Sequence, residues 1–387
     1  MNFKVYTLQE LATIKYGKSQ KKVVSDNGDI PIYGTGGLMG YAIQSLYDKP
    51  SVLIGRKGTI DRVHYVTQPF WTVDTLFYTE INNSIVLPHY LYYLLSILDL
   101  KQYNEGTTIP SLRTETLNRL EFNIPSIKNQ QKILAILEPL EYKIELNNKI
   151  NKNLEQQAQA IFKSWFVDFE PFGGIMPSDW SIVPLSQIAS FVNGYSYKSN
   201  ELISSTTAMT TIKNFERKSG FKLDGFKEIL PSGKIKTEQY VELFDVLVAH
   251  TDLTQNAEII GNAELILSFD DYDNVVFSMD LVKVQPKIEK ISKFLIFAIL
   301  KDRRFKEHCL GYTNGTTVLH LSKKALSEYK LILPKDLSIL FPLDEIITIF
   351  YKQIASNVEE NKKLKNLKDT LLPKLMSGEI DISEIDI

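Results

Sequence analysis

The sequence of 387 residues lacks the features that build disulfides, membrane spans and secretion signals. Its single cysteine, Cys309, excludes an intramolecular disulfide framework and a thiolate-rich zinc site, and it suggests a reducing compartment. It contains no run of 18 or more apolar residues, which argues against a membrane span. The N-terminal MNFKVYTLQE has no apolar signal-peptide core. We therefore expect a mature, cytoplasmic chain with no membrane association.

The net charge of the chain is also close to zero. The chain has 44 basic and 46 acidic residues, so its formal net charge is −2. Taken alone, this value disfavours a nucleic-acid partner, because such proteins usually carry a basic excess. The charges are uneven, however: 15–22 holds four lysines and no acid, and 213–236 holds seven basic residues against three acidic ones. These stretches are either ordinary solvated loops or loops that follow a phosphate backbone.

Catalytic signatures are missing as well. We find no Ser/His or Cys/His set, no Rossmann fingerprint, no nucleophile elbow and no Asn/Asp-Pro-Pro-aromatic motif of amino-methyltransferases. None of the histidines is spaced as a metal-binding pair. Surface or core positions are therefore expected for all five, which are His64, His89, His250, His308 and His320. These absences favour a binding protein over an enzyme, with no cofactor held by this chain.

One stretch imitates a phosphate-binding loop. Ala12-x4-Gly17-Lys18-Ser19 fits a relaxed version of that pattern. Its first position is alanine, the residues before it indicate a helical turn instead of a strand, and Gly194-Tyr195-Ser196 of the repeat described below has no lysine. We interpret the stretch as a loop between a helix and a strand.

What the sequence does contain is an internal repeat. TLQELATIKYG, from Thr7, matches PLSQIASFVNG, from Pro184, with a shift of 177 residues. GTTIPSLRTETLNRLEFNIP, from Gly106, matches GTTVLHLSKKALSEYKLILP, from Gly315, with a shift of 209. The second copy therefore carries 209 − 177 = 32 extra residues between these anchors.

Each copy is followed by a long heptad pattern, at about 127–165 and 340–376. The apolar seam of the first runs from Ile133 to Trp165 and that of the second from Leu343 to Leu375. Pro139 is expected to kink the first helix or to mark its true start. A second apolar stripe on the first helix is expected to receive partner helices; its members are Ile136, Leu146, Phe162 and Phe166.

The fold class that follows is α+β: two globular mixed α/β domains, each followed by a long helix, in an internal repeat. We expect domains at 1–125 and 173–336, with helical segments at 126–172 and 337–387. The expected strands cover 51–54, 72–78, 245–249 and 275–284, and the expected short helices 87–98 and 291–300. EPFGGIMP, at 170–177, is the expected linker between the halves.

This arrangement resembles the specificity subunit of type I restriction–modification enzymes over nearly the whole chain. The resemblance rests on L-x2-[LI]-A…G at both domain starts, and on NEGTTIPSL with NGTTVLHL. It also rests on 124–133 with Gln130, on AIFKSWFVDFEP at 160–171, and on LLPKLMSGEI at 371–380.

The resemblance implies a function. Each globular domain would be a target recognition domain that reads one half of a bipartite, asymmetric site in double-stranded DNA. The two long helices would separate the domains, pair as an antiparallel coiled coil in a pseudo-twofold arrangement, set the spacer and dock two methyltransferase subunits. The chain itself would be non-catalytic, and the partners would hold the cofactors: S-adenosylmethionine for methylation, and ATP with Mg²⁺ for the restriction subunits of the full complex.

Asparagines interrupt both heptad seams at equivalent places near the helix centres. They are Asn147, Asn151, Asn357 and Asn361. In an antiparallel pair related by a twofold the centres meet, so we expect one polar layer there that fixes the register at some expense of stability. The alternative is that the helices rotate and these side chains face water.

For DNA contact, basic, amide and aromatic side chains on glycine-bearing loops are the candidates. In the first domain they are Lys15, Lys18, Lys21, Lys22, Arg56, Lys57 and Arg62. In the second they are Tyr195, Lys198, Lys213, Asn214, Arg217, Lys218 and Lys222.

Other functions stay open at this point. The chain could serve a methyltransferase without restriction subunits, or be a coiled-coil adaptor that binds proteins and has no DNA role. A third alternative is a nuclease or NTPase built around Gly17-Lys18-Ser19.

Overall fold

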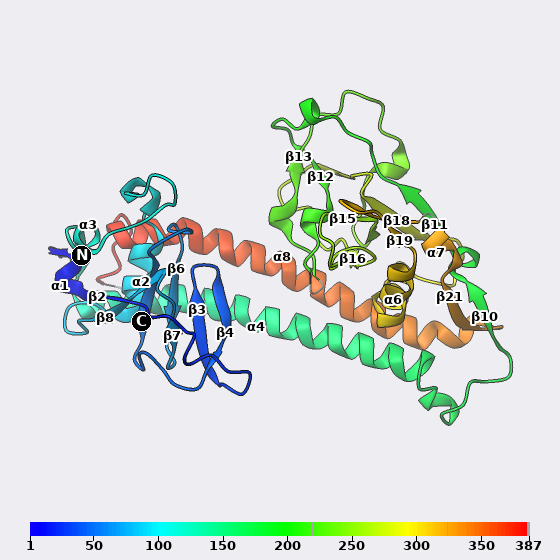
Figure 1. Cartoon of the computed structure of the whole chain (residues 1–387), viewed down its shortest axis with the longest axis horizontal. Helices are drawn as coiled ribbons and strands as arrows, with labels where there is room; N and C mark the ends of the chain where they lie inside the picture. Colours follow the sequence, from blue (N-terminus) through cyan, green and yellow to red (C-terminus); the bar gives the residue numbers. More distant parts are fainter. Residues whose placement is uncertain (218–219, 323, 385–387) are drawn as a thin grey trace. The chain divides into compact units, whose positions relative to one another are not determined.

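The structure is a computed structural model that describes residues 1–217, 220–322 and 324–384. The chain divides into two compact units, and each long helix contributes to both (Figure 1). Unit 1 comprises Met1–Ile144 and Lys363–Ile387, and unit 2 comprises Glu145–Lys362. Each unit therefore contains one globular part and about half of each long helix.

The two long helices are α4, Ile127–Phe166, and α8, Phe341–Ser377. Both lie within one residue of their predicted bounds. Pro139 does not mark the start of α4, because the helix begins at Ile127 and continues through the proline; the expected kink stays a prediction. Proline removes one backbone hydrogen bond, but Ile133 and Leu137, just before it, are fully buried in the core of unit 1 and hold that turn in place.

The described residues of unit 1 form three sheets. An antiparallel pair joins β1 (Phe3–Thr7) to β9 (Glu121–Pro125). The four-stranded sheet has the order β2 (Ala12–Tyr16), β8 (Leu76–Ile81), β5 (Ser51–Gly55), β6 (Val63–Val66). The three-stranded sheet has the order β4 (Gly37–Ala42), β3 (Ile30–Gly34), β7 (Trp71–Thr72). The helices of this unit, besides the halves of α4 and α8, are α1 (Leu8–Leu11), α2 (Pro88–Ser96) and α3 (Thr114–Asn118).

Unit 2 repeats this plan and adds to it. Its antiparallel pair is β10 (Trp180–Pro184) with β21 (Lys330–Pro334). Its four-stranded sheet is β11 (Ala189–Asn193), β18 (Leu281–Pro286), β14 (Val246–Ala249), β16 (Ala263–Leu265). Its matching three-stranded sheet is β13 (Lys227–Glu228), β12 (Thr207–Thr210), β17 (Asn274–Phe277). A further sheet is β15 (Thr251–Asp252), β20 (Leu319–Leu321), β19 (Thr313–Asn314), and the helices are α5 (Lys293–Lys301), α6 (Arg303–Gly311) and α7 (Lys324–Glu328).

The repeat seen in the sequence is therefore a repeat of topology. Phe3 pairs with Pro125 in unit 1, and Trp180 pairs with Pro334 in unit 2, which keeps the shifts of 177 and 209. The three-stranded sheets each combine an antiparallel hairpin with one parallel neighbour, β7 or β17. The same chain order and the same registers recur with different loops between them.

Two expected strands are each divided in the structure. The run 72–78 is split between β7 and β8, and 275–284 between β17 and β18, which belong to different sheets. A turn causes both divisions: the amide of Leu76 donates to the carbonyl of Val73, and that of Leu281 to Ser278, both at 3.0 Å. Apolar periodicity alone cannot show such a turn, because the residues on either side of it are all buried.

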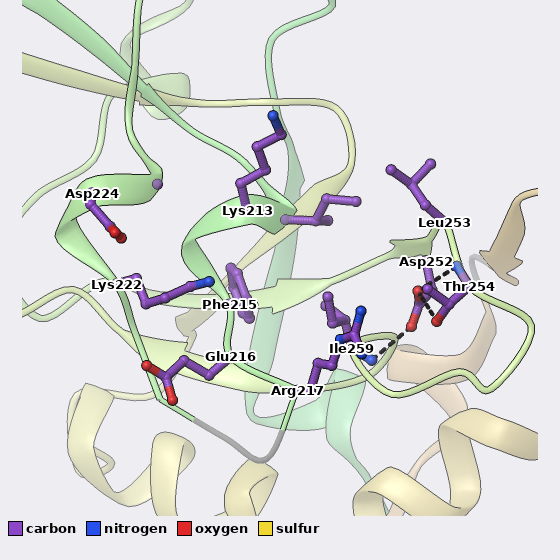
Figure 2. Close-up of a pocket in the computed structure, with 12 residues that line it drawn as sticks. Lys213, Phe215, Glu216, Arg217, Lys222, Asp224, Asp252, Leu253, Thr254 and Ile259 are labelled. Atoms are coloured by element: carbon purple, nitrogen blue, oxygen red, sulfur yellow. Dashed lines mark hydrogen bonds between the residues drawn. The ribbon is translucent and has the colours of Figure 1, made fainter. Parts of the chain in front are cut away.

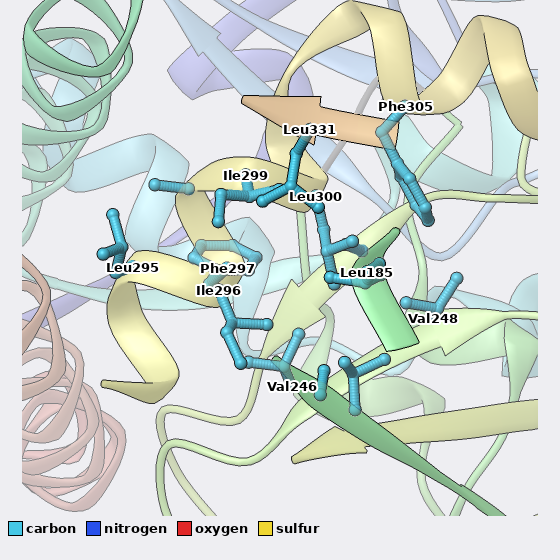
Figure 3. Close-up of a cluster of buried hydrophobic side chains, with 14 of the residues drawn as sticks. Leu185, Val246, Val248, Leu295, Ile296, Phe297, Ile299, Leu300, Phe305 and Leu331 are labelled. Carbon is cyan, nitrogen blue, oxygen red and sulfur yellow. The ribbon is translucent and has the colours of Figure 1, made fainter. Parts of the chain in front are cut away.

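The core of unit 2 forms where α5 packs on the four-stranded sheet (Figure 3). Every residue from Phe294 to Leu300 is buried, so α5 is apolar on all sides, as expected for a helix enclosed between a sheet and other helices. Phe297 reaches Tyr351 of α8 with ring centres 5.0 Å apart. This contact ties the globular part of unit 2 to its portion of the long helix. Among the described residues, no helix has the length and apolar character needed to cross a membrane.

Candidate nucleic-acid interface

In unit 1, two basic loops meet at the segment 72–76. The amide of Lys18, just after β2, donates to the carbonyl of Thr72 (2.8 Å). The amide of Arg56, just after β5, donates to the carbonyl of Thr75 (2.8 Å). Residues far apart in the sequence are thereby held at one edge of the unit by backbone hydrogen bonds, which do not depend on the side chains exposed there.

The Gly-Thr-Thr loop of unit 1 lies on the same edge. Asn104 Oδ1 accepts the amide of Gly106 (2.9 Å), and the amide of Leu112 donates to the carbonyl of Arg56 (2.9 Å). A Cβ on Gly106 would lie 1.9 Å from the carbonyl oxygen of Ile109, so the turn requires glycine. The loop is thus closed beside the basic turn, and both of its threonines are exposed.

Unit 2 builds the same loop against a different neighbour. A Cβ on Gly315 would lie 2.1 Å from the carbonyl oxygen of Val318, the same close approach as in unit 1. Gln255 Nε2 donates to the carbonyl of Thr316 (2.6 Å), and the amide of Leu321 donates to the carbonyl of His250 (2.8 Å). The second Gly-Thr-Thr loop therefore lies beside the segment 250–255.

The segment 250–255 also borders an open cavity of about 710 Å³ (Figure 2). The cavity lies between residues of 212–217 and 222–225 on one side and of 252–259 on the other. Lys213, Arg217 and Lys222 line it together with the acidic Glu216 and Asp224. Its rim is therefore polar and of mixed charge, with phenylalanine and isoleucine side chains beneath.

A buried carboxylate holds the wall of this cavity. Asp252 accepts the amides of Thr254 (2.8 Å) and Ile259 (2.7 Å). Burial alone would raise the pKa of Asp252, but the hydrogen bonds from Ile259 and Thr254 outweigh it and lower the pKa. Asp252 is therefore ionised and fixes the loop from within.

A buried lysine completes the wall. Lys306 Nζ donates to the carbonyls of Ala257 and Glu258 (both 3.1 Å) and to Asn262 Oδ1 (2.9 Å). Burial lowers the pKa of Lys306. The loop between Asp252 and Asn262 is thus held at both ends by hydrogen bonds to buried charged side chains.

The comparisons with known proteins decide the family. Residues 1–156 and 177–366 match the family model of the type I restriction modification DNA specificity domain. The chain belongs to this family. The two matches correspond to the two topological repeats, each followed by most of its long helix.

Relatives of this specificity-domain protein match most of its length. It is 26% identical over 365 residues to the type I restriction enzyme HindI specificity subunit of Haemophilus influenzae, covering 78% of this chain and 79% of that one. It is 24% identical over 357 residues to the MjaIX specificity subunit of Methanocaldococcus jannaschii, covering 88% and 80%. The crystal structure of a type I restriction–modification S subunit from M. genitalium has the same fold, with a TM-score of 0.58, 17% identity, and coverage of 97% and 96%.

Within this specificity-domain protein, most DNA-contact candidates of unit 1 are exposed loop residues: Lys18, Lys21, Lys22, Lys57 and Arg62. Arg56 is half-buried; its Nη1 donates to the carbonyl of Asp74 (2.8 Å), and its guanidinium lies 5.0 Å from the Tyr16 ring centre. Lys15 was expected on a loop, but it lies on β2, 3.5 Å from Glu80. That ion pair makes Lys15 the weakest candidate of the set.

In unit 2 the candidates divide into exposed and buried groups. Lys198, Lys213, Arg217 and Lys222 are exposed. Lys218 lies outside the described residues. Arg217 pairs with Glu258 at 3.2 Å.

Tyr195 and Asn214 have structural roles instead of the exposed positions expected for them. The Tyr195 hydroxyl donates to Glu201 (3.0 Å) and is buried. Asn214 is fully buried; its Oδ1 accepts the amide of Thr211 (2.9 Å), and its Nδ2 donates to the carbonyl of Lys222 (2.8 Å). Both side chains are buried and hold their own loops by hydrogen bonds, which argues against direct contact with DNA.

The stretch that imitates a phosphate-binding loop cannot wrap a phosphate. The amide of Gly17 donates to the carbonyl of Leu76 (3.0 Å), and the amide of Lys18 is likewise engaged within the sheet. A phosphate-binding loop needs free amides that converge on the ligand. The residues before Ala12 form α1, as the sequence indicates. The interpretation of the whole stretch as a loop is wrong, because Ala12–Tyr16 is strand β2 and the loop begins only after it.

The four seam asparagines hydrogen-bond to one another across α4 and α8, all within unit 2. Asn147 Nδ2 donates to Asn361 Oδ1 (2.9 Å), and Asn357 Nδ2 donates to Asn151 Oδ1 (2.7 Å). The residue numbers of both pairs sum to 508, so the helices run antiparallel there. We call these four residues the asparagine layer. Asn147 and Asn357 are buried, so the alternative in which all four face water does not hold.

The second apolar stripe of α4 is only partly available to a partner. Phe162 and Phe166 are buried in the core of unit 2, against Trp180 and its neighbours, which corrects their expected role in docking. Leu146 is exposed, and so are Tyr142 and Ile150, one helical turn away on either side. The accessible apolar face of α4 is therefore Tyr142, Leu146 and Ile150.

The lone cysteine is inert. Cys309 is fully buried, and burial raises the pKa of its thiol to about 12. Among the described residues, no three histidine, cysteine or acidic side chains are grouped so as to hold a metal.

The sequence did not point to two parts of the candidate interface. The Gly-Thr-Thr loops served only as repeat markers, although they lie beside Arg56 and beside the segment 250–255. Their exact recurrence was the available signal, since both copies keep the glycine that a closed turn requires. The hairpin β3–β4 was missed because no charge marks it.

Proposed function

We propose that the chain is the DNA specificity subunit of a type I restriction–modification enzyme, with one recognition domain in each unit. The observation that carries this proposal is that one topology is built twice with different loops at equivalent strand ends. Two similar frames can dock on the two halves of a duplex site, and different loops read different bases. The site is then bipartite and asymmetric.

In this proposal α4 and α8 act as the spacer between the half-sites, in a pseudo-twofold arrangement. A helix of 40 residues is about 60 Å long at 1.5 Å per residue, and half-sites one DNA turn apart lie about 34–36 Å from each other. The length therefore suffices. The asparagine layer supports a fixed register, because a polar layer penalises any slip that would leave its amides unpaired.

Catalysis and cofactors belong to partners in this proposal. Two methyltransferase subunits, using S-adenosylmethionine, dock on the helix pair, and the apolar face of Tyr142, Leu146 and Ile150 is a suitable contact surface. Restriction subunits that use ATP and Mg²⁺ join the full complex. The selection of the site is the contribution of this chain.

The test is methylome sequencing of cells that express this chain with its cognate methyltransferase. We expect one bipartite motif with a fixed gap, methylated on adenine. The R56A/K57A double variant should relax one half of the motif and leave the other unchanged. A protein-binding adaptor without a DNA role would give no motif and no salt-dependent shift of duplex DNA.

A further inference from the structure

The hairpin β3–β4 exposes an apolar tip. Leu38 is 56% exposed and Met39 61% exposed, and Tyr41 on the same strand and Ile43 just after it are exposed as well. Only Thr35 and Gly36 lie between the two strands. Exposed apolar groups gathered on a narrow projection indicate a contact surface.

The local geometry aims these side chains outward. Tyr33 pairs with Leu38 and Ile32 with Gly40, which leaves Met39 as the extra residue of a β-bulge. Bulges redirect a side chain relative to the regular pleat. Gly37 has a φ of +107°, which glycine adopts without strain, so the turn is built for this shape.

Lysines flank the hairpin. The amide of Ile43 donates to the carbonyl of Val23 (3.0 Å), so the turn that carries Lys21 and Lys22 is bonded directly to the end of β4. Within the described parts of the chain, no carboxylate forms an ion pair with Lys18, Lys21 or Lys22. Lysines without an ion pair beside an apolar tip complement a polyanion whose groove contains apolar groups.

The equivalent hairpin of unit 2 has different chemistry. There the residues 211–226 separate β12 from β13, and they carry Lys213, Arg217 and Lys222 at the mixed-charge cavity. The extra residues of the second copy thus replace a short apolar tip by a long charged loop. The two units therefore present different groups at the same topological position.

We propose, on the basis of the function above, that the β3–β4 hairpin enters the DNA major groove at the first half-site and reads thymine through its 5-methyl group with Leu38 and Met39. The major groove admits a two-stranded β-ribbon, and thymine is the base that presents a methyl group there. Lys21 and Lys22 hold the adjacent phosphates. The half-site read by unit 1 then depends on apolar contact, and the half-site read by unit 2 on polar contact.

The experiment measures binding of the complete chain with its methyltransferase to duplexes in which single thymines of the methylome motif are replaced by deoxyuridine, which lacks only the methyl group. Replacement of one particular thymine in the first half-site should lower the binding affinity about fourfold. The L38A/M39A variant should bind the unmodified site more weakly by a similar or larger factor and be insensitive to that replacement. Deoxyuridine in the second half-site should have the same effect on the wild type and on the variant.

Control variants separate this role from folding and from charge. V5A/I97A truncates two exposed apolar residues of unit 1 away from the hairpin and should keep the deoxyuridine effect. K21A/K22A should weaken binding and reduce its salt dependence while keeping that effect.

Three outcomes would overturn the inference: no thymine of the first half-site sensitive to deoxyuridine, an L38A/M39A variant as sensitive as the wild type, or loss of methyltransferase from the complex with DNA reading intact. The last would show that the tip docks a protein. If the wild type selected no sequence at all, the proposed function would fail first, and that result is distinguishable from all three.

Discussion

Glu141 shows how a single residue ties the globular part of unit 1 to its helices. It lies on α4 and pairs with Lys368 of α8 (2.8 Å) and with His89 of α2 (3.3 Å). Burial would raise the pKa of Glu141, but the hydrogen bonds from His89 and Lys368 outweigh it and hold the pKa at about 2. Three elements of unit 1 therefore meet at one ionised carboxylate.

A pH dependence follows from this shift. Because the pKa in the folded state lies below the unfolded value of about 4.3, the stabilisation is complete above that value and is lost as the pH falls toward about 2. We expect E141Q to lose up to about 3 kcal/mol of unfolding free energy at pH 6, and progressively less toward pH 2. Denaturant titrations of the full chain from pH 2.5 to 6 measure this.

The matched control is E145Q. Glu145 lies one turn along α4 and forms an exposed pair with Lys149, worth no more than about 0.5 kcal/mol. Equal losses in E141Q and E145Q, or an E141Q loss that does not shrink with acid, would contradict the role assigned to Glu141.

Gly106 is a residue on which a recognition loop depends. In G106A, the new Cβ would collide with the carbonyl of Ile109, so the Gly-Thr-Thr loop must open beside Arg56. We expect weaker reading of the first half-site with the second unchanged, measured by methylation of duplexes that carry a mutation in one half. G311A is the control, because a Cβ on Gly311 meets no atom within 4 Å. An unaltered first half-site in G106A would show that the loop shape is irrelevant to recognition.

At the scale of elements, the long helices and the strands at 51–54 and 245–249 were predictable, and the pairing of strands into sheets was not. Heptad periodicity over more than thirty residues is a local pattern, and the structure confirms both helices. The runs 72–78 and 275–284 contain turns between buried residues, so their division between sheets depends on long-range pairing that a local pattern does not record. The burial of Phe162 and Phe166 in the core of unit 2 could not be predicted for the same reason. An apolar stripe does not show whether it packs against the same chain or against a partner.

The asparagine layer gives a prediction at this scale. Replacement of all four asparagines by leucine should raise the thermal midpoint, because buried amides are exchanged for apolar packing. It should also broaden the accepted gap between half-sites, since nothing then penalises a register slip. Methylome sequencing and thermal unfolding together measure both effects.

The control for that variant is N153L, because Asn153 is exposed on α4 and bonds only to Gln157 of the same helix in the described contacts. If the variant with all four asparagines replaced by leucine still accepts a single gap length, the asparagine layer does not set the spacing.

For the whole molecule, the net charge of −2 conceals an uneven surface. Exposed lysines cluster at 15–22, where the sequence has no acidic residue, whereas the basic residues of the loops in unit 2 lie beside Glu216 and Asp224. A balanced total limits the sequence-independent attraction to DNA, so we expect the chain alone to bind duplex DNA much more weakly than its complex with methyltransferase does.

The salt dependence of binding tests which charges touch DNA. R56A/K57A should reduce the slope of log affinity against log salt by up to about 2, at about 0.9 for each lost phosphate contact. K4A/K128A removes the same charge from exposed positions on β1 and α4 and should leave the slope unchanged. Equal slopes in the two variants would mean that total charge, and not the loop, governs binding.

By itself, the sequence determined the repeat, the α+β class, both long helices, the family and the central asparagines, because each is carried by spacing along the chain. Only the tertiary structure decided which loops meet. The contacts of Lys18 with Thr72, of Arg56 with Thr75 and of Leu112 with Arg56 are backbone hydrogen bonds, so no side-chain pattern encodes them. The burial of Tyr195 and Asn214 and the apolar tip at Leu38 and Met39 were decided in the same way. Whether a loop side chain faces solvent depends on what the rest of the chain packs beneath it.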